Sequence, residues 1–164
     1  MSAPQTSAYR DAMARLGAAV NVVTTGTLES PVGFTASAVC SVTDTPPTLL
    51  VCLNRTSRVR EFFHIGSPLC VNVLSASQEE LSGHFATANS MEERFALGHW
   101  DTLSTGAPAL KEAVATFDCV ISQIVEVGTH SVLFGAVQAL RSNDEADGLA
   151  YFRRAYHSLK RILP

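Results

Sequence analysis

A run of alternating residue types at positions 34–43 constrains the fold more than any other feature of this sequence. One side of the run is apolar and the other mostly carries hydroxyl groups: the first comprises Phe34, Ala36, Ala38, Cys40 and Val42, and the second Thr35, Ser37, Val39, Ser41 and Thr43. Successive side chains of a β-strand point to opposite faces of a sheet, so this period of two predicts one strand over 34–43. The segment Asp44-Thr45-Pro46-Pro47 predicts its end, because proline cannot donate to the hydrogen-bond ladder.

Other segments predict further strands and a few short helices. Strand patterns occur at residues 48–54, 69–75, 114–127, 131–141 and 148–152. Gly128-Thr129-His130 separates the two longest and predicts a hairpin. Helical patterns occur at residues 7–17, 57–64 and 90–95, and after a capping box at Ser77–Glu80. We therefore expect a mainly β fold, a small antiparallel barrel over about residues 19–152 with short flanking helices, in a single domain of residues 1–164.

Composition and charge narrow the classes of function. Of 164 residues 46% are hydrophobic, and twelve Lys and Arg against fifteen Asp and Glu give a net charge of −3. The apolar content excludes intrinsic disorder, and the charge balance argues against a nucleic-acid partner. Every apolar stretch is well short of the roughly 18 residues of a membrane span. The first twenty residues carry Arg10, Asp11 and Arg15 and lack the apolar segment of a signal peptide, so we expect no membrane association and a cytoplasmic location.

Several catalytic and metal-binding motifs are absent from the sequence. No two of the ten glycines are two residues apart, so the Gly-x-Gly-x-x-Gly dinucleotide fingerprint does not occur. The four cysteines, at positions 40, 52, 70 and 119, form no Cys-x-x-Cys pair and have no histidine at zinc-finger spacing. We predict no metal site, and thiols that act as small buried apolar groups.

Three patches have the composition of ligand sites, and each has an ordinary alternative. The hydroxyl-rich side of 34–43 can hydrogen-bond the edge of a flat ligand, or it can face solvent. The segment Asn54–Arg60 places three arginines between a strand end and a predicted helix start, which favours phosphate binding, although a solvated basic turn has the same composition. His130 follows Gly128 at the hairpin tip and can contact a ligand or be an ordinary surface histidine.

Longer motifs connect these patches in a fixed order. They are residues 9–25, 33–55, 69–75 (Leu-Cys-Val-Asn-Val-Leu-Ser), 91–95 (Met-Glu-Glu-Arg-Phe), 128–130 (Gly-Thr-His) and 148–157. Together they resemble the short-chain flavin reductase family, whose members hand reduced flavin to two-component monooxygenases. The resemblance covers about residues 8–159 and is closest to the reductases that serve pyrimidine (uracil) and 4-hydroxyphenylacetate monooxygenases. A corrinoid reductase of cobalamin biosynthesis is also similar.

The resemblance implies an FMN-binding split β-barrel, antiparallel with Greek-key connections, that forms a homodimer. The residues it implies for flavin binding are Thr35, Ala36, Ser37, Ala38, Ser41, Cys52, Leu53, Asn54, Ser57, Arg58, His84 and Phe85. His130 is the implied catalytic residue. The residues implied for contact with NADH are His130, Tyr151, Arg153 and Tyr156.

The activity that the resemblance implies is transfer of a hydride from NAD(P)H to FMN, followed by transient delivery of reduced flavin to a partner monooxygenase. FAD in place of FMN is possible within the family. Two other functions remain open: a flavoprotein that reduces a corrinoid, and a non-catalytic FMN-binding protein.

Overall fold

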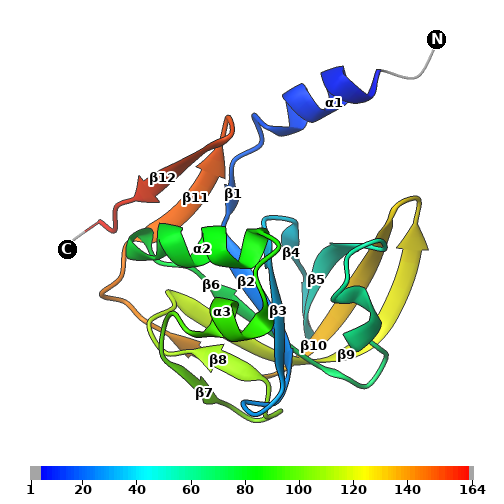
Figure 1. Cartoon of the computed structure of the whole chain (residues 1–164), viewed down its shortest axis with the longest axis vertical. Helices are drawn as coiled ribbons and strands as arrows, with labels where there is room; N and C mark the ends of the chain where they lie inside the picture. The colour runs from blue at the N-terminus through cyan, green and yellow to red at the C-terminus, as the bar shows by residue number, and fades with distance from the viewer. Residues whose placement is uncertain (1–4, 163–164) are drawn as a thin grey trace.

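The structure, a computed structural model, describes residues 5–162 and is mainly antiparallel β (Figure 1). Its strands are β1 (Ala18–Ala19), β2 (Asn21–Gly26), β3 (Pro31–Ala36), β4 (Val39–Asp44), β5 (Pro47–Asn54), β6 (Pro68–Val73), β7 (Trp100–Thr102), β8 (Pro108–Leu110), β9 (Ala115–Val127), β10 (His130–Ser142), β11 (Gly148–Phe152) and β12 (Ala155–Leu159). The predicted mainly β fold class is confirmed, and so is the hairpin between β9 and β10.

Seven strands form one sheet in the order β3-β2-β6-β9-β10-β5-β4, and its two ends meet. The end strands β3 and β4 are separated in the sequence only by Ser37 and Ala38. Three peptide links span at most about 11 Å, so the sheet must curl until these ends lie together. The backbone N–H of Cys52 in β5 donates to the carbonyl of Ala38 (3.0 Å), which extends the β4–β5 pairing into this link. The short link between β3 and β4 closes the sheet into a barrel.

The prediction of one continuous strand over 34–43 is therefore wrong. The chain leaves β3 after Ala36, turns at Ser37 and Ala38, and begins β4 at Val39 on the other end of the sheet. Alternation describes how side chains point along the backbone and carries no information about the neighbouring strand. In β3 the side chains of Phe34 and Ala36 are buried, whereas in β4 Val39 packs against the same core and Cys40 and Val42 are exposed. The step at residues 37–38 thus changes which side of the alternation faces the core, and the alternation of residue types in the sequence does not record that change.

The helices are short, and two of them differ from prediction. They are α1 (Thr6–Met13), α2 (Glu79–Ala86) and α3 (Met91–Phe95), with 3₁₀ turns η1 (Arg60–Phe62) and η2 (Ala76–Gln78). The helix predicted over 57–64 is reduced to η1, because successive N–H groups here bond three residues back, as from Arg60 to Ser57 (3.0 Å). The N-terminal helix ends at Met13 and not at Gly17. The capping box lies at Ser75 and Gln78, two residues before the predicted one.

Two apolar cores lie on opposite faces of β2. Val23 belongs to the barrel interior, together with Val51, Leu69, Leu133 and Phe63. Its neighbour Val22 belongs to a second core, formed by Leu74, Leu81, Phe85 and Leu149 beneath α2. Both valines are fully buried. Because both faces of β2 are covered, this strand holds the barrel, α2 and the C-terminal region together.

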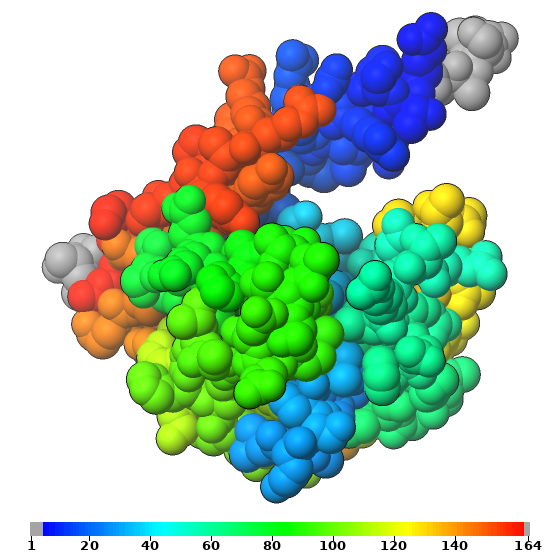
Figure 2. Space-filling model, viewed as in Figure 1, coloured from blue at the N-terminus to red at the C-terminus, as the bar shows by residue number. Residues whose placement is uncertain are grey.

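Two smaller sheets flank the barrel. Strands β1, β11 and β12 form one of them, in the order β1-β11-β12, and β7 pairs with β8 in the other. In the space-filling view α1 and the β11–β12 hairpin extend away from the barrel as one arm (Figure 2). No residue of α1 is buried. The predicted barrel range ends within this arm, because β11 belongs to the three-stranded sheet and not to the barrel sheet.

The four cysteines differ in burial. Cys70 and Cys119 are buried, as predicted, and desolvation raises the pKa of both thiols. Cys40 is exposed on β4, so that part of the prediction is wrong, and Cys52 is half-buried. Within residues 5–162 no three His, Cys, Asp or Glu side chains gather as metal ligands. Among the described helices, none has the length and apolar content needed to cross a membrane.

Candidate functional site

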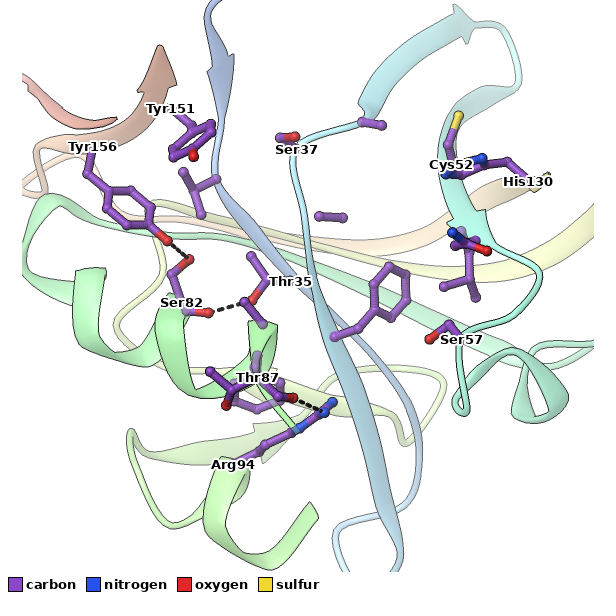
Figure 3. Close-up of a pocket in the computed structure, with 18 residues that line it drawn as sticks. Thr35, Ser37, Cys52, Ser57, Ser82, Thr87, Arg94, His130, Tyr151 and Tyr156 are labelled. Atoms are coloured by element: carbon purple, nitrogen blue, oxygen red, sulfur yellow. Dashed lines mark hydrogen bonds between the residues drawn. The ribbon is translucent and has the colours of Figure 1, made fainter. Parts of the chain in front are cut away.

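A pocket of about 590 Å³ opens between the barrel closure, α2 and the C-terminal hairpin (Figure 3). Its volume lies in the range of small-molecule sites. Most of the predicted site residues line it: Thr35, Ala36, Ser37, Ala38, Cys52, Leu53, Asn54, Ser57, Phe85, His130, Tyr151 and Tyr156. These residues span more than a hundred positions of sequence, so their convergence is a property of the fold.

Four predicted residues do not line the pocket. Ser41 lies beyond the barrel closure, on β4, and lines a separate apolar hollow of about 380 Å³. Arg58 is exposed on the turn next to Ser57. His84 lies on α2 with its Nδ1 within hydrogen-bond distance of the Asn89 amide (3.4 Å). Arg153 lies in the β11–β12 turn, with its guanidinium over the Phe152 ring (5.5 Å to the centroid). The strand break at 37–38 accounts for the position of Ser41, and Arg58 and Arg153 lie on turns that direct them elsewhere.

One wall of the pocket is formed by the end of β5 and the start of β10; we call it the strand wall. The pairing of the two strands sets His130 directly opposite Asn54. The Asn54 side chain accepts hydrogen bonds from the backbone N–H and the hydroxyl of Thr56 (both 2.9 Å), which shapes the turn that carries Ser57. Thr129 Oγ1 lies 2.9 Å from His130 Nδ1. Asn54 and His130 therefore each have a local contact that limits side-chain rotation.

The opposite wall is formed by α2, α3 and β12; we call it the helical wall. Ser82 of α2 is its centre: its carbonyl accepts from Thr35 Oγ1 (2.7 Å), and its hydroxyl bonds the phenol of Tyr156 (2.9 Å) (Figure 3). Tyr156 also packs against Tyr151, with ring centroids 5.3 Å apart. These contacts tie β3, α2 and the C-terminal hairpin together across the edge of the pocket.

Phe85 lies under this wall because Gly33 leaves room for it. A Cβ at position 33 would lie 2.8 Å from the Phe85 ring, so no larger residue fits without moving the ring. Phe85 is 2% exposed and also packs edge-to-face against Phe95 (4.9 Å). An aromatic ring fixed in this way gives the pocket a firm apolar border.

Arg94 lines the pocket and was not among the predicted site residues. Its guanidinium donates to three backbone carbonyls, those of Gly33 (2.7 Å), Thr87 (2.6 Å) and Asn89 (3.1 Å). Partial burial lowers the pKa of Arg94 from its usual value. A guanidinium has five N–H groups, so two remain for a ligand. The Met91–Phe95 motif contains Arg94, but its spacing gave no sign of these distant carbonyl partners.

Ser82 and Thr87 also line the pocket without having been predicted. Ser82 lies three residues before Phe85 on α2, so helical periodicity places both on one face of the helix. That periodicity was the available signal for Ser82. Thr87 follows the helix end, where no pattern distinguishes it from a loop residue.

The chemistry of the lining fits a flat ligand that carries negative charge. Hydroxyl groups, an amide, an imidazole and a guanidinium surround the pocket, and within the described residues no Asp or Glu lines it. Hydroxyl and backbone groups along 35–38 can bond the edge of a planar ring. The absence of a lining carboxylate and the presence of Arg94 suit a phosphate. FMN, which combines a planar ring with one phosphate, fits both features.

Comparisons with known proteins agree with this fit. The flavin reductase like domain matches residues 13–160. The chain is 58% identical over 151 residues to a protein of Serratia proteamaculans named FMN reductase (NADH) RutF, covering 92% of this chain and 86% of that one. It also resembles the crystal structure of a putative flavin reductase from Haemophilus somnus, with a TM-score of 0.92 and 47% identity over 95% of this chain and all of that one.

A third similar structure is the styrene monooxygenase flavin reductase of Pseudomonas putida, with a TM-score of 0.82 and 26% identity. The match covers 94% of this chain and 99% of that one. The split-barrel expectation is confirmed by this agreement in fold, and the predicted family is confirmed by the domain match. From its sequence and its barrel alike, this chain belongs to the flavin reductase-like family.

Proposed function

We propose that this protein is an FMN reductase that takes a hydride from NADH. One observation carries the proposal: a pocket bordered by hydroxyl and backbone groups, with a guanidinium and no lining carboxylate, in a chain 58% identical to a protein named FMN reductase (NADH). Nothing in the pocket requires a metal or a general base, and hydride transfer needs neither.

The proposed roles follow the two walls. Residues 35–38 border the ring, and Cys52, Leu53, Asn54 and Ser57 bind the ribityl chain and phosphate. Arg94 supplies positive charge to the same pocket. Phe85 borders the ring on the helical side. His130 and the two tyrosines, Tyr151 and Tyr156, hold the nicotinamide of NADH.

Bound FMN supplies the electron-accepting ring, and the protein supplies orientation and exclusion of water. His130, held through Thr129, can hydrogen-bond the nicotinamide amide without transferring a proton. Tyr156, fixed by Ser82, limits how far the C-terminal hairpin can move from the pocket. The chain thus contributes to the rate mainly through positioning of the two reactants.

The partners and location are part of the proposal. A monooxygenase component is the proposed acceptor of reduced flavin, supported by similarity to the styrene monooxygenase flavin reductase. A homodimer is supported by α1, where Tyr9 and Met13 are exposed, and by the apolar hollow beside β4. A cytoplasmic location is supported by the need for NADH, which cells keep inside.

The test is to mix the protein with NADH and excess FMN and follow the loss of NADH absorbance. Rapid oxidation that requires both FMN and protein supports the proposal. No oxidation leaves only a flavin-binding protein. Much faster turnover with a corrinoid than with FMN, or FMN that stays bound through gel filtration while added FMN is not reduced, identifies a reductase with another acceptor.

A further inference from the structure

A group of charged side chains lies behind the strand wall, with the carboxylate of Glu126 at its centre. Ser131 donates to Glu126 (2.9 and 3.0 Å to the two oxygens). Arg60 reaches the same carboxylate through Nη2 (3.0 Å), and Arg55 Nε lies 3.3 Å from it. None of these residues lines the pocket, so the group has no place in the proposed chemistry.

The group is connected inward through a buried hydroxyl. Ser131 is fully buried, and its oxygen accepts from Arg60 Nε (2.6 Å) while its hydrogen goes to Glu126. Hydrogen bonds from Ser131 and Arg60, with the charges of both arginines, hold the pKa of Glu126 below its usual value. The carboxylate is therefore ionised at neutral pH. An exposed ion pair contributes little alone, but a connected network with a buried member is worth more.

The same arginines hold the two loops that form the strand wall. Arg55 donates through Nη1 to the carbonyl of Gly128 (3.3 Å), and its backbone N–H donates to the carbonyl of Thr129 (2.9 Å). Both acceptors lie in the tip of the β9–β10 hairpin, immediately before His130. Arg60 donates through Nη1 to the carbonyl of Phe63 (2.8 Å), which fixes the far end of the turn that carries Ser57.

We propose that Glu126 is a positioning residue: it holds Arg55 and Arg60 so that the hairpin tip and the 55–63 turn keep one relative position, and thereby sets His130 against the pocket. The functional half of this inference rests on the proposed NADH role of His130. The ion pairs of Glu126 also distinguish the three arginines of the segment Asn54–Arg60 from one another. Arg55 and Arg60 pair with Glu126, whereas Arg58 forms no ion pair with a described residue and does not line the pocket.

The first experiment measures the position of the loops without using activity. In Glu126→Gln the carboxylate charge is lost while the side-chain size is kept. We expect faster hydrogen–deuterium exchange over residues 54–63 and 127–131 and unchanged exchange elsewhere. The matched control is Glu145→Gln, which removes another exposed carboxylate that pairs with an arginine, Arg161, far from the strand wall. Unchanged exchange in Glu126→Gln would overturn the inference.

The second experiment measures the consequence for the reaction. With saturating FMN, Glu126→Gln should raise KM for NADH about fivefold or more and change kcat less than twofold, while Glu145→Gln matches the parent. A KM within twofold of the parent, alongside faster exchange, would show that Glu126 holds the two loops but does not position His130. Should Glu126→Gln fail to fold, Arg55→Gln removes the side-chain bond to Gly128 and the ion pair with Glu126, and it is expected to behave the same way.

A double-mutant cycle with His130→Ala decides whether Glu126 acts through His130. If it does, adding Glu126→Gln to His130→Ala should raise KM no further. Fully additive effects would overturn the proposed route. If His130→Ala alone leaves NADH kinetics unchanged, the NADH role of His130 is wrong, and the exchange measurement still decides whether Glu126 holds the loops. A parent protein that does not oxidise NADH at all would overturn the proposed function and leave that measurement intact.

Discussion

The two walls of the pocket are built in different ways. In the strand wall, His130 and Asn54 face each other in a continuous ladder, so backbone pairing fixes their positions. In the helical wall, segments far apart in sequence meet through single side chains: Arg94 reaches Gly33, and Ser82 reaches Tyr156. A ladder distributes its stability over many backbone bonds, whereas the helical wall depends on a few. A single substitution that removes one of these side-chain contacts should therefore displace the whole helical wall. A single substitution in the strand wall should affect only the function of the side chain that is replaced.

The largest effect is expected for Arg94→Ala. Three carbonyls lose their donor and the pocket loses its guanidinium, which we expect to cost about 3 kcal/mol of unfolding free energy, or roughly 6–12 °C in Tm. FMN affinity should fall more than tenfold as well. Thermal unfolding and flavin fluorescence measure the two effects. Arg154→Ala, which removes an arginine that is exposed and paired with Asp11, is the control and should change neither. If Arg94→Ala matched this control, the helical wall would not depend on Arg94.

His130→Ala tests the strand wall. Loss of the imidazole should raise KM for NADH and slow hydride transfer by about 10–100-fold, or about 1.4–2.7 kcal/mol. FMN affinity should stay within a factor of about three, because the ladder under His130 remains paired. Stopped-flow reduction of bound FMN by NADH is the measurement. An unchanged rate constant and unchanged NADH dependence would leave Tyr151 and Tyr156 to place the nicotinamide.

Ser57→Asp tests which part of the ligand the strand wall holds. A carboxylate beside the phosphate should lower FMN affinity at least tenfold, about 1.4 kcal/mol, through like-charge repulsion. Riboflavin, which lacks the phosphate, should bind the variant almost as well as it binds the parent. Titration of both flavins by fluorescence provides the comparison. Equal loss for the two ligands would mean that the turn does not contact the phosphate.

The smallest effect is expected for Tyr156→Phe. This change removes the hydroxyl bonded to Ser82 and keeps the ring packed on Tyr151, so it should cost about 1 kcal/mol and raise KM for NADH about threefold. Ser82→Ala should have a similar effect, and the double variant should be no worse than either single one. Additive losses would show that the two hydroxyl groups act separately and that no hydrogen bond closes the helical wall.

The same difference between the two walls explains which pocket residues could be predicted from the sequence. Asn54, Ser57 and His130 lie at strand ends and turns, which local sequence patterns can predict. Arg94 and Ser82 matter through partners up to 74 positions away, and no local pattern records such a partner. The break at Ser37 and Ala38 went unseen for a related reason, since the residue types keep alternating across it although the side that faces the core changes. The family resemblance supplied the order of the motifs, and only the fold supplied their contacts.

Closure of the barrel also has a consequence for folding. Ser37 and Ala38 join the two ends of a seven-stranded sheet and also line the pocket. The ring-binding border therefore comes into existence only when the last pair of edges meets, after contacts between distant parts of the sequence have formed. A chain with its strands paired but its barrel open has no such border and cannot hold flavin there. Flavin bound there, as we propose, would select the closed state and stabilise it by mass action.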